Sequence, residues 1–193
     1  MRALRFPAAL AASAIVLAAG CATTRPSAPP APASVASAFE ADGRLSARRG
    51  SDAVAVHFAW RHTQAADDFD VATPLGQTVA RMRRDASGVR VERPGEAPAG
   101  YADWGALTQA VLGVAIPVDG LASWIQGVPD AGAASGVERD AAGRAEVLRQ
   151  QGWEIVYAYA DDGGGRPSRV VMRYPGSEPV EVRIAIDRFT QIP

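Results

Sequence analysis

Few residues of this 193-residue chain have the types and spacing that catalysis requires. The two histidines, His57 and His62, are five positions apart, so on a strand their side chains would point to opposite faces. The sequence contains no CxxC, HExxH, GxSxG or P-loop motif. The acidic pairs at 67–68 and 161–162 fall in expected turns, where solvated charge is a sufficient explanation. We therefore expect no enzyme activity, no cofactor and no metal site.

The residue whose position does indicate chemistry is Cys21, the only cysteine in the chain. It follows an uncharged apolar stretch, residues 6–19, which is itself preceded by Arg2 and Arg5. This pattern is typical of a signal peptide, and the stretch is shorter than the roughly 20 apolar residues that span a bilayer. A thiol without an intrachain partner must be hidden, paired outside or modified. Its place at the expected cleavage site favours modification, the alternative being an ordinary signal with an incidental cysteine.

The segment Leu17-Ala18-Ala19-Gly20-Cys21 resembles the lipobox of bacterial lipoproteins. It departs from the usual pattern because the large apolar residue comes four positions before the cysteine instead of three. The resemblance implies that residues 1–20 are removed and that Cys21 is triacylated, which supplies more than the marginal anchoring of one chain. By resemblance to the sorting rule of enteric lipoproteins, Ala22 favours the outer membrane.

The charge balance of the mature part excludes a nucleic-acid-binding protein. Without residues 1–20, 18 basic and 21 acidic residues remain, a net charge of −3. Residues 21–38 combine the cysteine with a stretch rich in Pro, Ala, Ser and Thr, which we interpret as a tether reaching roughly 50 Å at most. The remaining residues, 39–193, are long enough for one folded domain.

Alternating apolar and polar residues predict a mainly antiparallel β fold. Val54, Val56, Phe58 and Trp60, for example, share one face of an expected strand. Gly-, Pro- and Ser-rich turns separate the strands. The expected strands cover residues 39–48, 53–60, 68–73, 77–84, 88–93, 144–151, 153–159, 168–174 and 180–187.

Two short stretches in the middle of the chain have helical spacing instead. Residues 103–113 place Trp104, Leu107, Val111 and Leu112 on one face, with Asp103 as an N-cap and Gly113 as the stop. Residues 119–126 place Leu121, Trp124 and Ile125 on one face, with Asp119 as the expected N-cap and Gly127 as the C-cap. These two helices interrupt a meander of nine or more strands.

A sheet of this length must curl or close to bury one face, and helices over its mouth would complete a dry interior. The pattern leaves two alternatives for that interior. It is either packed solid, as in most small barrels, or it encloses an apolar cavity for a ligand.

The loop Thr73-Pro74-Leu75-Gly76-Gln77 contains an unusual apolar residue. Pro74 and Gly76 account for a tight turn, but they do not account for Leu75, which such a turn would hold in water. Leu75 either folds back onto the sheet or serves as a hydrophobic finger for a membrane or a partner.

Several fragments together, in their order and spacing, resemble the LolB family of outer-membrane lipoproteins over roughly residues 39–189. No single fragment is specific for the family, but the whole set, following a lipobox, is specific. The fragments are GRLS (43–46), FAW (58–60), TPLGQ (73–77), GVAIPVDGL (113–121), WIQGVP (124–129), QGWEIVY (151–157) and PSR (167–169).

The resemblance implies a half-open antiparallel β-barrel with a helical lid over an apolar cavity. It also implies a monomer that faces the periplasm, receives triacylated client lipoproteins from the periplasmic carrier LolA and releases them into outer-membrane phospholipid. The loop of Pro74, Leu75 and Gly76 would assist insertion. We hypothesise that the cavity and lid are lined by Phe58, Trp60, Leu107, Leu121, Trp124, Ile125, Trp153, Tyr157, Val182 and Ile184.

The main alternative is a structural or assembly-factor lipoprotein that binds protein partners with a solid barrel. A folded interior with a void of acyl-chain width would separate the two hypotheses. A hydrolase is a distant third, since it would need a polar triad inside the barrel.

Overall fold

The computed structural model describes residues 35–160 and 165–193. Cys21, the expected signal peptide, most of the expected tether and the acidic pair at 161–162 lie outside the described residues.

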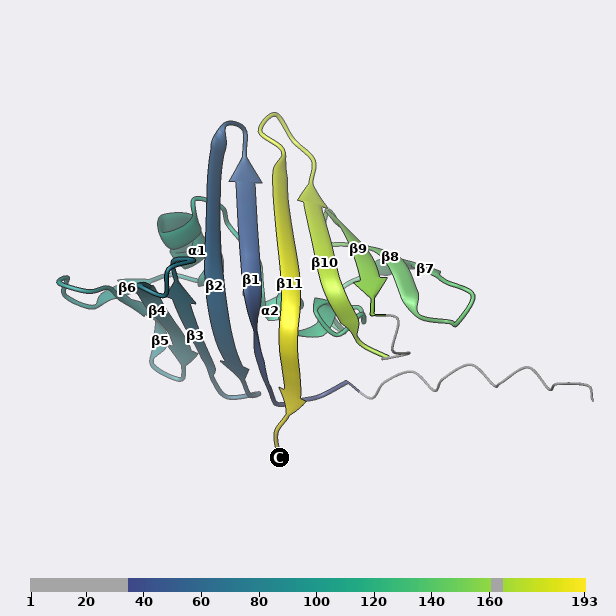
Figure 1. The fold of residues 1–193 in the computed structure, drawn as a ribbon, viewed down its shortest axis with the longest axis horizontal. Helices are drawn as coiled ribbons and strands as arrows, with labels where there is room; N and C mark the ends of the chain where they lie inside the picture. The colour runs from purple at the N-terminus through teal and green to yellow at the C-terminus, as the bar shows by residue number, and fades with distance from the viewer. Residues whose placement is uncertain (1–34, 161–164) are drawn as a thin grey trace, which may run out of the picture.

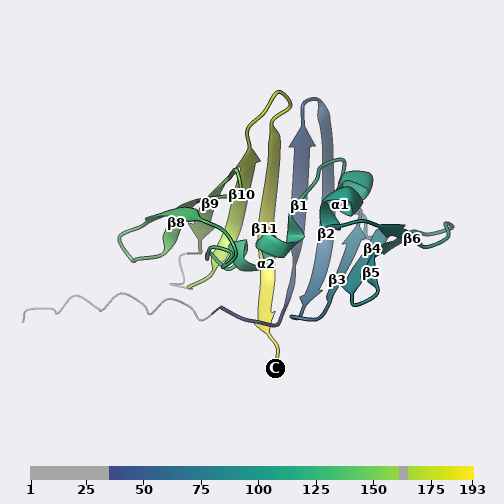
Figure 2. The same ribbon diagram turned by 180° about the vertical axis from the view of Figure 1, so that it is seen from behind.

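Eleven strands form one antiparallel sheet in the order β6-β5-β4-β3-β2-β1-β11-β10-β9-β8-β7. The sheet curves strongly, and the helices α1 and α2 lie against its concave side (Figures 1 and 2). Within the described residues, β6 and β7 each pair on one side only, so the sheet is not closed. The strands are β1 (Phe39–Arg49), β2 (Asp52–His62), β3 (Asp67–Ala72), β4 (Thr78–Asp85), β5 (Gly88–Glu92), β6 (Ala99–Tyr101), β7 (Ser135–Arg139), β8 (Ala145–Gln150), β9 (Trp153–Tyr159), β10 (Pro167–Tyr174) and β11 (Val180–Gln191).

This architecture confirms the expected fold class, an unclosed antiparallel β-barrel covered by short helices. All nine expected strands are present, with ends that differ by at most four residues. The two strands that periodicity missed are the edge strands β6 and β7. Both are short, and neither has a run of alternating buried and exposed residues that could reveal it.

The two ends of the domain meet at the centre of the sheet, where β1 pairs with β11 and Phe39 lies opposite Gln191. The register shifts between Asp42 and Gly43. At this bulge the two backbones come so close that a Cβ atom on Gly43 would lie 2.0 Å from the carbonyl oxygen of Ala185. A glycine is therefore required at this position of the central strand pair.

The first helix, α1 (Trp104–Leu112), is capped as expected. The Asp103 carboxylate accepts a hydrogen bond of 2.8 Å from the backbone N–H of Ala106. Gly113 ends the helix with a φ of +76°.

The second helix, α2 (Val118–Trp124), corrects one expectation, because its N-cap is Pro117 and not Asp119. The backbone N–H of Leu121 bonds to the carbonyl of Pro117, so the first turn closes earlier than expected. Asp119 lies in that first turn, where its negative charge interacts favourably with the helix dipole. Gly127 has the positive φ of a helix-ending glycine but follows the C-cap Ile125 by two residues.

The concave side of the sheet and the inner sides of both helices form one apolar core. Its buried members run from Ala36 to Ile184. A protein that lacks the expected signal peptide and Cys21, and so begins at Ala22, would keep all of these core residues. Ala36 is itself fixed, because its backbone N–H and carbonyl both bond to the side chain of Gln126, at 2.7 and 3.1 Å. The packed part of the chain therefore begins before β1.

Asp67 corrects the expectation that the 67–68 pair lies in a solvated turn. It is the first residue of β3 and is 2% exposed. Its carboxylate accepts hydrogen bonds from Trp60 Nε1 at 2.9 Å and from Arg84 Nε at 2.9 Å, and it lies 2.7 Å from His62 Nδ1. Burial by itself would raise the pKa of Asp67, but the bonds from His62, Trp60 and Arg84 outweigh it and hold that pKa below its usual value.

We expect Asp67→Asn to lower the free energy of unfolding at neutral pH by about 3 kcal/mol, because it leaves the Arg84 guanidinium without its buried counter-charge and removes the carboxylate that bonds to His62. The lowered pKa makes the contribution of Asp67 complete above the pKa of an unfolded Asp, about 3.9, and removes it as pH falls through the folded-state pKa. Urea unfolding at a series of pH values measures both effects.

The unsubstituted protein should therefore lose more stability on acidification than the Asp67→Asn variant does. Asp68→Asn is the matched control, because the Asp68 side chain is half exposed and its ion pair with Arg83 is a surface pair. Parallel pH profiles for the unsubstituted protein and Asp67→Asn would show that Asp67 does not couple stability to pH.

Candidate functional site

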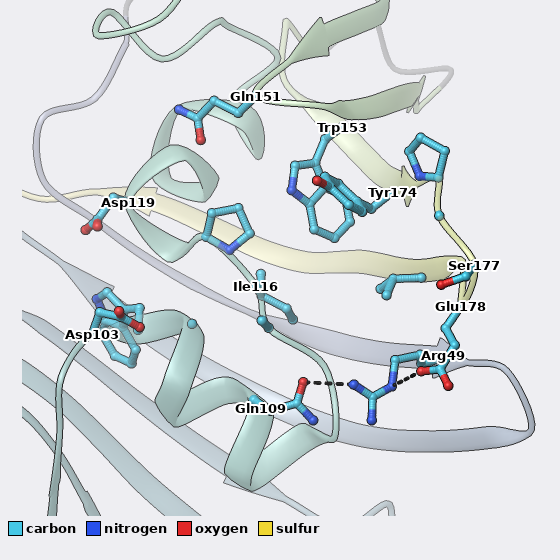
Figure 3. Close-up of a pocket in the computed structure, with 17 residues that line it drawn as sticks. Arg49, Asp103, Gln109, Ile116, Asp119, Gln151, Trp153, Tyr174, Ser177 and Glu178 are labelled. Atoms are coloured by element: carbon cyan, nitrogen blue, oxygen red, sulfur yellow. Dashed lines mark hydrogen bonds and ion pairs between the residues drawn. The ribbon is translucent and has the colours of Figure 1, made fainter.

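A pocket of about 700 Å³ lies on the concave side at the end of the sheet where the β1–β2 and β10–β11 hairpins turn (Figure 3). Its volume falls in the range of small-molecule sites, about 300–1,000 Å³. It is bounded by α1, by the connection between the two helices, by the start of β9 and by the β10–β11 loop.

The walls of the pocket are largely apolar, whereas its rim is charged. Trp153 and Tyr174 form one wall, with ring centroids 5.3 Å apart. Ile116 and Pro117 supply the facing wall from the connection between the helices, and Trp104 lines the pocket from the first turn of α1. The charged residues on the lining are Arg49, Asp103, Asp119 and Glu178. An amphiphile, with an apolar body and a polar head, matches this distribution.

A bridge of polar side chains crosses one end of the pocket (Figure 3). Arg49, the last residue of β1, donates from Nη1 to Gln109 Oε1 of α1 at 3.2 Å, and its Nε lies 3.5 Å from Glu178 Oε2. Arg49 thus joins the β1–β2 hairpin, the helix α1 and the β10–β11 loop. Its position fixes α1 against the rim.

Two buried polar groups near this interior have no hydrogen-bond partner among the described residues. They are Nε1 of Trp104, which belongs to the pocket lining, and the hydroxyl of Tyr157 on the concave side of β9. Burial raises the pKa of Tyr157, so its hydroxyl stays protonated and remains a donor. An unpaired buried donor costs about 1–3 kcal/mol, so both groups would gain from a carbonyl acceptor.

The ten side chains expected to line the cavity and lid are all in the apolar core, each at most 6% exposed. The tertiary structure therefore brings this set together on the concave side. Only Trp153 among them also lines the 700 Å³ pocket. The other nine are buried members of the apolar core.

The loop of Pro74, Leu75 and Gly76 joins β3 to β4. It is closed by two backbone bonds, from Thr73 N–H to the Gln77 carbonyl and from Gly76 N–H to the Thr73 carbonyl, each 2.8 Å. Gly76 has a φ of +84°, which a glycine adopts without strain. Leu75 is 90% exposed, so it projects into solvent and does not fold back onto the sheet.

The histidines lie on different faces, as expected from their spacing. His57 is exposed, and His62 is bound to Asp67. Across residues 35–160 and 165–193, no cluster of three His, Cys, Asp or Glu side chains is arranged for a metal. In that same part of the chain, no helix has the length and apolar character needed to cross a bilayer.

Sequence reasoning missed most of the pocket rim. The sequence does not single out Arg49, Gln109 or Tyr174 as site residues. No local signal identifies them, because each comes from a different segment and acquires its role from the fold. Trp104 did carry a signal, since it begins the apolar face of α1.

The comparisons with known proteins agree on one family. The model of the family "Outer membrane lipoprotein LolB" matches residues 37–189. The outer-membrane lipoprotein LolB of Thiobacillus denitrificans is 35% identical over 90% of this chain and 92% of that protein. The LolB proteins of Azoarcus sp. (35% identity, 96% of this chain and 95% of that protein) and Chromobacterium violaceum (37%, 85% and 89%) are similar over comparable lengths.

A solved structure also shares the fold. The LolA superfamily protein of Nitrosomonas europaea superposes with a TM-score of 0.50 over 81% of this chain and 86% of that one, at 9% sequence identity. That likeness concerns the fold alone, whereas the family match and the relatives concern the sequence. On that sequence evidence, the chain belongs to the LolB family of outer-membrane lipoproteins.

Proposed function

We propose that this protein accepts triacylated lipoproteins from the periplasmic carrier LolA and inserts them into the inner leaflet of the outer membrane. The observation that carries the proposal is the apolar-walled pocket of about 700 Å³ beside the helical cover of the concave core. A pocket of this volume favours a lipid-binding role over a solid barrel that binds only protein partners.

The energetic need for such a site is large. Burying one methylene group is worth about 0.8 kcal/mol, so exposing a long acyl chain to water costs on the order of 10 kcal/mol. The walls around Trp153 and Ile116 would shield the first part of a chain. Deeper entry requires the cover to lift, because side chains such as Leu107 and Trp124 are fully buried between the helices and the sheet. Transfer then needs no bond chemistry, only a more favourable acceptor.

The unpaired donors suit the linkage of the client's lipid. The acyl chains of a diacylglyceryl group end in ester carbonyls, which accept hydrogen bonds. Trp104 lines the pocket, and its buried Nε1 lacks an acceptor among the described residues. We assign it the role of donor to an ester carbonyl of the bound lipid.

We expect the chain from Ala22 to Pro193, without lipid, to bind a peptide with a diacylglyceryl cysteine. Trp104→Phe should weaken that binding about fivefold, the effect of one net hydrogen bond of about 1 kcal/mol. Titration calorimetry of purified protein in detergent-free buffer measures the affinity.

The matched ligand is an S-hexadecyl peptide, which has an alkyl chain but no ester. Trp104→Phe should leave its affinity unchanged. Equal weakening for both peptides would mean that Trp104 contributes only packing, and no binding of either peptide by the unsubstituted protein would remove the acyl-chain site itself.

Leu75 is the residue that we propose to enter the membrane during insertion. It is 90% exposed in a tight turn whose backbone bonds are complete, so its exposure does not depend on a poorly folded loop. One Leu side chain gains only about 1.5–3 kcal/mol on full burial. This is enough to orient an already anchored protein but too little to hold one at the surface.

We expect Leu75→Glu to fold normally and to bind the diacylglyceryl peptide normally, but to insert client lipoprotein into vesicles at least tenfold more slowly. The reason is that a carboxylate cannot enter the acyl region without losing its hydration. Sedimentation of vesicles after mixing with client-loaded protein measures insertion.

Gln77→Glu is the matched control, because it adds the same charge two residues away at an exposed position without removing the apolar side chain. It should insert client at close to the normal rate. Normal insertion by Leu75→Glu would remove Leu75 from the mechanism.

We further propose that Cys21 carries the lipid that anchors this protein to the outer membrane, with residues 22–35 linking that lipid to a monomeric domain in the periplasm. Mass spectrometry of the purified mature protein tests the lipid. A cysteine without acyl chains would contradict the anchor.

A further inference from the structure

The helices leave one face of the sheet uncovered (Figure 1). Residues of that face line a groove of about 530 Å³. It lies over the central strands β1, β2, β10 and β11, and the β3–β4 loop reaches its rim. We call it the arginine groove. It is defined by Arg44, His57, Pro74, Arg169, Arg173 and Arg183.

Strand register places three of these arginines around one small residue. Ala185 of β11 pairs with Arg44 on one side and with Arg169 on the other. Because neighbouring strands are about 4.8 Å apart, the two arginine backbones lie about 10 Å from each other. Arg183 is two residues from Ala185 on the same face. The alanine leaves room above it for three long side chains to approach one bound group.

Elsewhere this face neutralises its own charges through cross-strand ion pairs. Examples are Arg61 with Glu40 at 2.8 Å and Arg83 with Asp68 at 2.9 Å. The groove differs, because no carboxylate is part of its described lining. It therefore has a local excess of positive charge in a chain whose formal net charge is −1.

The nearby carboxylates are too few to balance the four arginines. Arg44 pairs with Asp187 at 2.9 Å, while Arg173 and Arg183 share Glu181 at 2.9 and 2.7 Å. Glu181 and Asp187 thus form ion pairs with three guanidinium groups, which leaves an excess of positive charge. Arg169 makes no ion pair with any described residue.

Arg169 is therefore the cation most available to a ligand. Guanidinium groups bind phosphate oxygens in bidentate fashion, so a phosphate is the chemical group that best fits several converging arginines.

The position of the β3–β4 loop indicates where that phosphate comes from. Pro74 lines the groove, and the next residue is the exposed Leu75. An apolar side chain beside a cationic surface matches the boundary of a bilayer, where phosphates lie just outside the acyl chains. A soluble acidic protein would match the charge but would leave Leu75 unexplained.

We propose that the arginine groove binds the phosphate-bearing head groups of anionic phospholipids while Leu75 enters the acyl region beneath them. This inference rests on the proposed function, because it assumes that the protein works at a membrane surface. It adds a polar recognition site to what would otherwise be a single apolar contact, and it orients the uncovered face of the sheet toward the bilayer.

The test uses the chain from Ala22 to Pro193 without lipid and measures its partition onto sedimented vesicles. Vesicles of equal parts phosphatidylcholine and phosphatidylglycerol should bind it more strongly than phosphatidylcholine alone, and added salt should reduce the difference. Arg169→Ala should lower the partition onto the anionic vesicles about fivefold, the effect expected for one arginine at a charged surface.

Arg169→Lys should bind more weakly than the unsubstituted protein but more strongly than Arg169→Ala, because lysine keeps the charge and lacks the bidentate guanidinium. Arg139→Ala is the matched control: it removes the same charge from an exposed residue of the edge strand β7 that makes no ion pair with any described residue. Its partition should be unchanged.

Equal partition of Arg169→Ala and Arg139→Ala would overturn the groove as a lipid site. The proposal would also be overturned if Arg169→Ala bound vesicles normally but no longer received client from the carrier. That result would mean that the groove binds an acidic protein and not a lipid.

Binding of the diacylglyceryl peptide in the absence of vesicles separates this proposal from the proposed function. If the peptide binds and Arg169→Ala has no effect on vesicles, the groove alone is wrong. If the peptide does not bind, the acyl-chain site fails whatever the vesicles show.

Discussion

The concave side of an open sheet must be kept from water, and the rest of this structure depends on how that is done. The strands supply apolar side chains from every part of the sheet, but within the described residues the edge strands β6 and β7 do not pair with each other, so the sheet does not close over those side chains. The segment between β6 and β7 therefore folds back as α1 and α2. Trp124 is fully buried there and donates from Nε1 to Gln150 Oε1 at 2.7 Å, so the cover is bound to β8 by a hydrogen bond as well as by packing.

The same cover leaves open the pocket that we propose as the lipid site. Two short helices bury the core without filling the end of the sheet near Arg49, and the pocket lies in the space that remains. The buried donors of Trp104 and Tyr157 have no acceptor among the described residues, which costs stability, and a ligand with carbonyl oxygens would supply one. Departures from ideal burial of this kind are typical of functional sites.

The two faces of the sheet differ in chemical character. The concave face is apolar and covered, while the uncovered face carries arginines and acids that pair across strands. That pairing fails over the arginine groove, where Glu181 and Asp187 are the only described carboxylates that ion-pair with its four arginines. Leu75 stands beside this groove, so the proposed membrane contact joins an apolar residue with a cationic surface.

Much of the fold was predictable from local pattern. Period-two alternation identified nine strands, and Asp103 and Gly113 identified the ends of α1, because these features depend on neighbouring residues along the chain. Only the tertiary structure decided what depends on distant segments. Asp67 seemed a solvated acid until β2 and β4 brought Trp60 and Arg84 to it. The exposure of Leu75 was likewise undecided, since a turn does not reveal which surface lies beneath it.

The sequence by itself determined the family, the strand faces and the set of side chains that share the core. It could not determine the pocket rim, where Arg49, Gln109 and Glu178 meet from three separate segments. It also could not show that Arg44 and Arg169, 125 positions apart, flank the same alanine. Side-chain alternation reports which face a residue occupies, but the pairing of β1 with β11 decides which residues become neighbours on that face.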